Sequence, residues 1–424
     1  MGVLLIIVGV SQSWSVALAI LNLCLISAVM TLGVNIQWGY AGLFNAGVMG
    51  FTALGGVAAV LVSVAPVGAA WEAGGSGVTG AAIVCVVVVA AVVIIQRMLR
   101  AYFGIRQALI VIALVVGFGV YRSVLDPAVS AIEAVEPAKT GFLGGLGLPI
   151  LLSWFVGGVL AAGVAWVIGK VALGLRSDYF AIATLGISEI IIAVLKNEDW
   201  LTRGVKNVTG LPRPVPYEID VQQSPAYQEW ANQLGLSIVE FSSLYVKLCY
   251  AGLFLVVLLA ILYLSQKALH SPWGRMMRAI RDNETAASAM GKNVTGRHLQ
   301  VFILGSAVIG IAGAMLTTID GQFTPSSYQP LRFTFLIWVM VIVGGSGNNL
   351  GSVVGAFVVW FFWIEAEPLG LWMMDTITSG MSEQDPLRLH LIESASHMRL
   401  IMMGAVLLLV LRFSPKGLIP EQNR

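Results

Sequence analysis

The stretch SPWGRMMRAIRDNETAASAMGKNVTGRHL, residues 271–299, is a polar segment between two apolar runs, 249–265 and 299–319. Six Lys and Arg residues fall between Lys267 and Arg297. Each flanking run is long enough to cross the hydrocarbon core of a bilayer as a helix, which takes about 20 residues. This part of the chain therefore predicts two membrane-spanning helices joined by a basic loop.

The same alternation of apolar runs and short polar connections continues along all 424 residues. The chain is 58% hydrophobic and 11% charged, whereas soluble domains carry about 25% charged residues. We expect an all-α, polytopic integral membrane protein with about 10–11 transmembrane helices in a single membrane domain, 1–424. The expected spans are 3–33, 38–64, 80–96, 104–121, 148–169, 178–195, 249–265, 299–319, 333–346, 350–366 and 400–411. The first is either one long helix or a short apolar lead-in followed by a span.

Charge on the connecting segments predicts the orientation, because cytoplasmic loops carry an excess of Lys and Arg. The connections on one side hold 14 basic and 4 acidic residues, and those on the other side hold 10 basic and 16 acidic residues. The basic set includes the segment 266–298 and the tail 412–424. We therefore expect both of these to be cytoplasmic and the long segment 196–248 to be external, as either a connector or a docking surface.

The segment 271–299 contains signals for two short helices. Ser271 followed by Pro272 is typical of an N-cap with proline at the first helical position, and this helix can run to about Arg281. Its arginines, Arg281 included, are expected on exposed faces. Asp282 or Asn283 can cap a second helix.

The second helix is expected to end at Gly291, which suits the position after a helix C-cap. It presents small side chains, including Ala286 and Ala287, so it can enter a shallow groove on another protein. Two interpretations remain open. The segment is either an ordinary basic loop beside lipid phosphates or a lever that transmits motion from a cytoplasmic partner.

The pattern S-P-x-G-R-x-x-R-A-I-R-D-N-E-x-A-A-x-x-x-G, from Ser271 to Gly291, resembles the cytoplasmic coupling segment of branched-chain amino-acid ABC importer permeases, in particular their M-type subunit. Three further stretches agree: NIQWGYAGLFNAGVMGFTALGG (35–56), LRSDYFAIATLGISEII (175–191) and VIVGGSGNNLGSVVGAF (341–357). The ending RFSPKGLIP (412–420) is similar to the family's usual close. The resemblance therefore covers nearly the whole chain in the same order.

The resemblance implies a permease subunit that translocates branched-chain amino acids, or a related solute such as urea or a short amide, across the bacterial inner membrane by alternating access. It implies a sister permease in a heterodimer, two cytoplasmic ATP-binding subunits, a periplasmic solute-binding protein and membrane lipid as partners. No nucleic acid, cofactor, metal site or catalytic residue is expected. ATP hydrolysis belongs to the partner subunits, because the chain contains no Walker A sequence.

The resemblance also implies a short coupling helix and assigns ATPase coupling to six residues: Arg278, Arg281, Glu284, Ala286, Ala287 and Gly291. This chain departs from the broader signature E-A-A-x-x-x-G, because Thr285 holds the place of the acid and Glu284 precedes it. Residues 98–147 look like an insertion with an extra span relative to the family's layout.

Two glycine-interrupted apolar stretches, 39–56 and 344–355, indicate where a substrate can pass, because transporter paths often lie at broken helices. Gly42, Ala46 and Gly50 are spaced for one smooth helix face, and packing alone is an alternative explanation for such residues. The polar side chains that we expect to line the path are Tyr40, Asn45, Tyr179 and Glu189. Glu189 lies within a span, which makes it a functional candidate, with a structural hydrogen-bonding role as the alternative.

Two other classes of function are weighed against the importer. An ion-coupled secondary transporter would use Glu189 as its proton or sodium site, although such proteins usually hold several buried charges near the midplane. An integral membrane enzyme would need nucleophiles, acids or metal ligands clustered at one membrane surface, and the four scattered histidines do not form such a cluster.

Overall fold

The computed structural model describes residues 2–99, 102–137, 139–382 and 384–421. The longer helices are α1 (Gly2–Ser11), α2 (Trp14–Ala41), α3 (Val48–Ser63), α5 (Ser76–Met98), α6 (Phe103–Glu133), α7 (Leu151–Ala172), α8 (Ser177–Asn197), α11 (Pro225–Gln233), α12 (Ile238–His270), α13 (Pro272–Asp282), α15 (Val294–Asp320), α16 (Pro330–Gly344), α17 (Asn349–Ile377), α18 (Pro386–Glu393) and α19 (Met398–Phe413). The shorter elements are α4 (Gly68–Ala70), the π-helix η1 (Trp71–Gly75), α9 (Asp199–Thr202), the 3-10 helix η2 (Gly204–Lys206), β1 (Val208–Thr209), α10 (Glu218–Gln223), α14 (Glu284–Ala289), β2 (Gln322–Phe323), and the 3-10 helices η3 (Pro325–Ser327) and η4 (Ser394–His397).

The fold is all-α and polytopic, which confirms the predicted class. Among the described residues, nine helical stretches are long and apolar enough to cross a membrane. The apolar helices α3 and α16 are shorter, and with them the structure agrees with the predicted ten to eleven crossings. The short helix α1 precedes α2 and is separate from it. Ser13 caps the start of α2, because its hydroxyl accepts hydrogen bonds from the backbone N–H groups of Ser15 and Val16.

The first two expected spans have different boundaries in the structure. Helix α2 continues through residues 34–41 and ends at Gly42, whose φ of 71° lies in the left-handed region that glycine adopts readily. Gly42 N–H donates to the Trp38 carbonyl, as in an αL-type helix end, and Leu43 N–H donates to the Gln37 carbonyl. Gly42 and Ala46 lie in the break before α3, so the expected helix face of Gly42, Ala46 and Gly50 is wrong.

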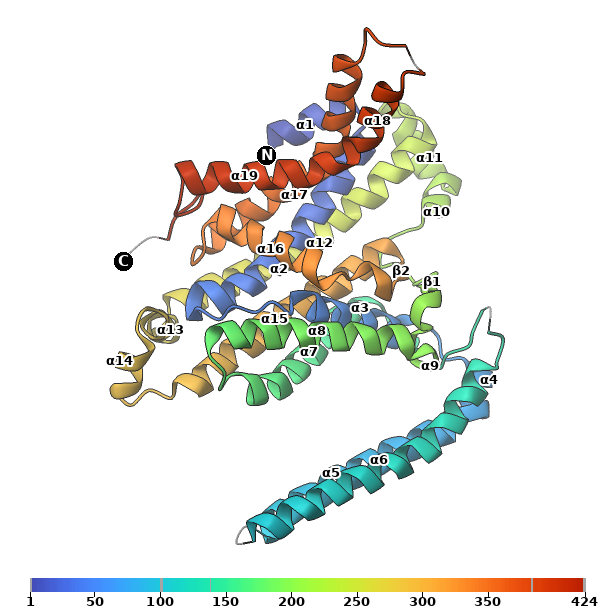
Figure 1. Ribbon diagram of the computed structural model, residues 1–424. Coiled ribbons are helices and arrows are strands. Elements are labelled where there is room, and N and C mark those ends of the chain that lie inside the picture. The colour runs from blue at the N-terminus through green and yellow to red at the C-terminus, as the bar shows by residue number, and fades with distance from the viewer. Residues whose placement is uncertain (1, 100–101, 138, 383, 422–424) are drawn as a thin grey trace.

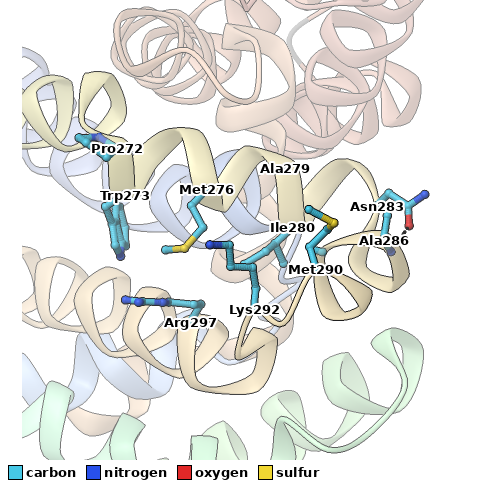
Figure 2. A pocket seen from close by; sticks show the side chains of 11 residues that line it. Pro272, Trp273, Met276, Ala279, Ile280, Asn283, Ala286, Met290, Lys292 and Arg297 are labelled. Carbon is cyan, nitrogen blue, oxygen red and sulfur yellow. Dashed lines mark hydrogen bonds between the residues drawn. The ribbon is translucent and has the colours of Figure 1, made fainter.

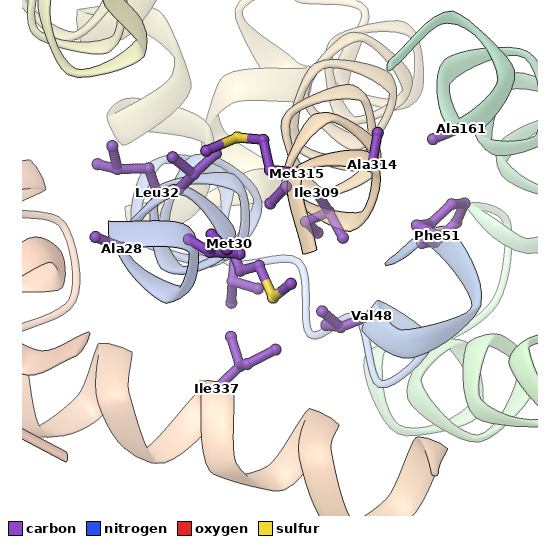
Figure 3. Close-up of a cluster of buried hydrophobic side chains, with 14 of the residues drawn as sticks. Ala28, Met30, Leu32, Val48, Phe51, Ala161, Ile309, Ala314, Met315 and Ile337 are labelled. Atoms are coloured by element: carbon purple, nitrogen blue, oxygen red, sulfur yellow. The ribbon is translucent and has the colours of Figure 1, made fainter. Parts of the chain in front are cut away.

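Helix α15 lies at the centre of the packing and contacts α2, α3 and α7. Figure 3 shows the buried side chains of Leu32 from α2, Phe51 from α3, and Ile309 and Met315 from α15 in this core. Gly310 of α15 lets the helices approach closely, because a Cβ on Gly310 would lie 2.5 Å from the carbonyl oxygen of Gly157 on α7. Small residues therefore serve close helix packing here, as in other membrane bundles.

On the predicted external side, the structure contains α9 to α11 and a small sheet. Within the described residues, β1 pairs antiparallel with β2, with Val208 opposite Phe323 and Thr209 opposite Gln322. Helix α11 starts at Pro225, directly after Ser224. Helix α12 begins at Ile238, eleven residues before the expected span at 249, and therefore extends beyond the apolar run.

Helices α5 and α6 form an antiparallel hairpin that points away from the rest of the molecule (Figure 1). The hairpin is attached at the end that carries α4 and η1, where α6 contacts α9. The most apolar windows of its two arms are only 6% and 11% buried within the protein. The unit that stands apart is 68–133, which overlaps the predicted insertion 98–147.

Candidate functional site

The polar segment 271–299 folds as two capped helices, α13 and α14. The Ser271 hydroxyl accepts a hydrogen bond from Gly274 N–H at 3.3 Å, and Pro272 occupies the first helical position. Asn283 then caps α14, because its side-chain oxygen accepts from Ala286 N–H at 2.9 Å. Side-chain oxygens satisfy N–H groups that a helix start leaves unpaired, so the chain turns sharply between the two helices.

Helix α14 is an exposed knob with a fixed end. Gly291 has a φ of 76°, and its N–H donates to the Ser288 carbonyl at 2.9 Å. Lys292 N–H donates to the Ala287 carbonyl at 3.2 Å, which completes a Schellman motif. No residue of α14 is buried. Both ends of this short helix are therefore capped, and its Ala287 is half-buried against the core, where α14 contacts α13 and α15.

An apolar groove of about 680 Å³ lies between α13, α14 and the start of α15. Figure 2 shows Trp273 and Met276 pointing from α13 toward Arg297, with Lys292 close by. The groove is lined by Pro272, Trp273, Met276, Ala279, Ile280, Asn283, Ala286, Ala287, Met290, Lys292 and Arg297. It therefore combines an apolar floor with a basic rim beside the exposed knob.

Arg281 faces the interior, which corrects the expectation that it is displayed with the other arginines. Its side chain is 24% exposed and forms an ion pair with Glu421, with 3.0 Å between Nη2 and Oε2. Its Nη1 donates to the carbonyl oxygen of Gly39, near the end of α2. A cation there complements the partial negative charge at a helix C-terminus. Arg281 therefore joins α13 to α2 and to the C-terminal tail.

The break between α2 and α3 is held by buried amides. Asn45 is fully buried, and its Nδ2 donates to Gln37 Oε1 at 2.9 Å. Gln37 in turn donates to the Phe302 carbonyl and the Ser306 hydroxyl of α15, each at 3.0 Å. The Trp338 indole N–H of α16 donates to the Asn45 carbonyl at 3.0 Å. The amide chain gives the non-helical backbone the partners that it needs within a membrane.

The second break, between α16 and α17, contacts the first half of the molecule. Gly345 and Gly347 have positive φ values of 114° and 86°. Gly347 N–H donates to Asn35 Oδ1 of α2 at 2.8 Å, and Asn35 Nδ2 donates to Asn349 Oδ1 at 2.9 Å. The Tyr40 hydroxyl also donates to Asn349 Oδ1, at 2.7 Å. The two breaks that the sequence predicted are therefore connected through α2.

The C-terminal tail is bound along the second break. Leu418 N–H donates to the Val343 carbonyl at 2.8 Å, and Ile419 N–H donates to the Gly344 carbonyl at 3.0 Å. The side-chain amide of Asn348 donates to the Pro420 carbonyl at 3.1 Å. With Glu421 paired to Arg281, the tail connects α13 to the end of α16.

An open cavity of about 870 Å³ lies between α8, α16 and α19, with the α2–α3 break at its edge. Its lining is mainly apolar and includes Phe44 and Trp338, whose rings lie 4.2 Å apart between centroids. Three charged side chains also line it: Glu189, Lys196 and Arg332. The cavity thus offers apolar walls together with both signs of charge.

The four expected path residues have different positions. Glu189 lines the cavity and is exposed to it. Tyr40 and Asn45 are fully buried and hold the two breaks, so neither reaches the cavity surface. Tyr179 lies near the start of α8 and is 60% exposed, away from the cavity lining.

The sequence interpretation missed Arg332 and Glu421. Arg332 is the only basic residue between Asp320 and Phe333 and lies two residues after Pro330. A single charge at the start of an apolar run is a signal that the sequence offered. Glu421 lies 140 residues from Arg281, and no sequence feature indicates their pairing.

These observations describe an all-α polytopic membrane protein with two linked helix breaks and an exposed, capped helical knob. The sequence matches the family described as "Branched-chain amino acid transport system / permease component" over residues 16–411. The chain therefore belongs to this family of membrane transport permeases.

Individual relatives agree with that membership. The chain is 25% identical to the high-affinity branched-chain amino acid transport system permease protein LivM of Escherichia coli (strain K12), over 62% of this chain and 56% of that protein. It is 24% identical to the probable branched-chain amino acid transport permease protein LivM of Methanocaldococcus jannaschii, over 93% and 90% of the two chains. A xylose transport system permease protein, XylH of Escherichia coli (strain K12), is 25% identical over 54% of this chain and 46% of its own length. The chain thus spans little more than half the length of the Escherichia coli LivM protein, and no solved structure matches it.

Proposed function

We propose that the chain is the transmembrane permease subunit of an ATP-driven importer, with α14 as the helix on which cytoplasmic ATP-binding subunits dock. The observation that carries the proposal is the exposed α14 knob, which is capped at both ends and lies beside an apolar groove with a basic rim. Ala286 and Ala287 present little bulk, so a partner surface can approach the helix backbone closely. The family's description as a permease component of a transport system supports the proposal.

Motion of docked subunits would reach the membrane helices through α13. Arg281 contacts Glu421 of the tail and the Gly39 carbonyl of α2, and those two segments hold the helix breaks. The mechanism would be alternating access, driven by partner subunits that prefer one conformation, because a ligand shifts an equilibrium only through such a preference. Arg278, Glu284 and Gly291 would shape the same docking surface.

The proposed substrate is a branched-chain amino acid, and the proposed path passes the cavity between α8, α16 and α19. Glu189 can attract an ammonium group, Lys196 and Arg332 can attract a carboxylate, and the apolar lining suits an aliphatic side chain. A sugar would need many hydrogen-bonding groups instead. A sister permease would close the open side of this cavity, and an external binding protein would deliver the substrate near α10 and α11. The proposed location is the bacterial inner membrane, with the C-terminus in the cytoplasm.

An ion-coupled transporter that uses Glu189 is less well supported. Ionisable residues with that role usually pair with one another or with backbone carbonyls, whereas Glu189 is exposed and forms no ion pair within the described residues.

The test is co-purification of the chain with its candidate ATP-binding subunits, followed by uptake in proteoliposomes. We expect Ala286→Arg and Ala287→Arg to remove the ATP-binding subunits and ATP-dependent leucine uptake. Gly174→Arg is the matched control, because it adds the same charge between α7 and α8 where a new side chain meets open space. The importer proposal fails if the ATP-binding subunits do not bind the intact chain while the chain alone transports. The substrate assignment fails if the intact complex takes up xylose in preference to leucine.

A further inference from the structure

The free end of the α5–α6 hairpin carries a polar hollow of about 780 Å³. Val93, Gln96 and Arg97 from α5 line it opposite Arg106, Gln107 and Ile110 from α6. Arg97 lies in the last turn of α5, and Arg106 lies in the first turn of α6. The structure thus places two guanidinium groups on the walls of one hollow.

These two charges have no acidic partner in the hairpin. Residues 73–125 contain no Asp or Glu, and within the described residues neither Arg97 nor Arg106 forms an ion pair. Arg106 lies over the Phe103 ring, 5.3 Å from its centroid, which leaves the guanidinium edge free to donate hydrogen bonds. Two like charges around one hollow favour an anion between them, and a guanidinium binds phosphate oxygens through paired N–H groups.

The position of the hollow indicates which anion is available. Arg106 and Arg122 are 16 residues apart on α6, which corresponds to about 24 Å at a rise of about 1.5 Å per residue. Residues 108–120 between them are apolar and mostly exposed, and a bilayer's hydrocarbon core is about 30 Å thick. The hollow therefore lies at the level where lipid headgroups begin, directly beyond aliphatic surface that lipid chains would cover.

We propose that this hollow, at the free end of hairpin α5–α6, binds the phosphate group of an acidic membrane lipid. The lipid's chains would lie along the aliphatic surface of α5 and α6, and its phosphate would bridge Arg97 and Arg106. The proposal does not depend on the transport function, because the hairpin lies apart from the knob, the breaks and the cavity.

The test uses the full chain in nanodiscs that contain equal amounts of phosphatidylglycerol and phosphatidylcholine, with the retained lipid measured by native mass spectrometry. We expect the intact chain to retain phosphatidylglycerol preferentially. The double variant Arg97→Gln with Arg106→Gln should lose affinity by about fivefold for each arginine removed. Arg97→Lys with Arg106→Lys should keep most of the preference. Arg122→Gln is the matched control, because Arg122 lies at the attached end and already pairs with Asp126 at 3.1 Å.

Two outcomes would overturn the proposal. One is equal retention of both lipids by the intact chain, and the other is a preference that survives the double glutamine variant. Added inorganic phosphate identifies the source of the anion: retention of free phosphate without retention of phosphatidylglycerol by the intact chain would refute a lipid site, and phosphatidylglycerol retained in the presence of phosphate would support it. Size-exclusion profiles of all variants show whether the glutamine pair still folds.

Discussion

At the scale of single residues, Arg281 of α13 contacts two other parts of the chain, the end of α2 and the C-terminal tail. It forms an ion pair with Glu421 and donates to the Gly39 carbonyl. We predict that Arg281→Gln leaves the ATP-binding subunits attached but lowers ATP-driven uptake about tenfold or more, because the docked helix loses its connection to the breaks. Losing hydrogen bonds to a charged group also destabilises a protein by about 1.5–3 kcal/mol.

The control for Arg281→Gln is Arg275→Gln on the same helix, because Arg275 is exposed and, within the part of the chain that the structure describes, donates only to the His270 carbonyl at the end of α12. Uptake and co-purification are measured for both variants, with thermal unfolding to separate stability from coupling. Glu421→Gln should reproduce part of the defect. If Arg281→Gln transports as well as the intact complex, Arg281 does not couple the two regions.

Residue roles were predictable where they depend on nearby sequence and not where they depend on tertiary contacts. Asn283 and Gly291 act within a few residues of their own position, and the sequence indicated both. Tyr40 and Asn45 were correctly singled out as polar groups in an apolar setting, yet their partners Asn349 and Gln37 turn them inward. The sequence could not distinguish a buried amide that holds a break from one that faces a substrate.

At the scale of helices, the close crossing of α3 and α15 depends on small residues. A Cβ on Gly55 would fall on the Gly310 carbonyl oxygen and lie 2.9 Å from Ala314 N. We predict that Gly55→Ala destabilises the protein by about 1–3 kcal/mol, because backbone atoms on both helices must shift to accept the methyl group. The measurement is the thermal unfolding midpoint in detergent.

Gly252→Ala on α12 is the matched control, since a Cβ there meets nothing within 4 Å. It should be neutral or raise the midpoint, because alanine is preferred to glycine in a helix by about 0.5–1 kcal/mol. Equal midpoints for the two variants would show that the α3–α15 crossing tolerates side chains.

Helix starts and ends were predictable from sequence to different degrees. The starts of α11 and α13 carry serine followed by proline, and the structure begins both helices at that proline. The first expected span ends at residue 33, whereas α2 continues through residues 34–41. The helix stops where Gly42 adopts a positive φ. Local capping chemistry is visible in a sequence, whereas the length of a buried apolar helix depends on what packs around it.

At the scale of the whole molecule, the hairpin 68–133 is structurally separable from the bundle. We predict that replacing residues 68–141 by a short Gly-Ser linker leaves the bundle folded, because the flanking segments already lie side by side: Gly147 N–H donates to the Val64 carbonyl and Leu148 N–H to the Val62 carbonyl, each at 2.9 Å. The knob, both breaks and the cavity between α8, α16 and α19 contain no residue of the deleted segment. The shortened chain should therefore keep its bound ATP-binding subunits and its leucine uptake while it loses the preference for phosphatidylglycerol.

Co-purification, uptake and lipid retention are measured on the same preparation of the shortened chain. Loss of uptake with the ATP-binding subunits still attached would place the hairpin in the transport mechanism, and an unchanged lipid preference would place the acidic-lipid site on the bundle.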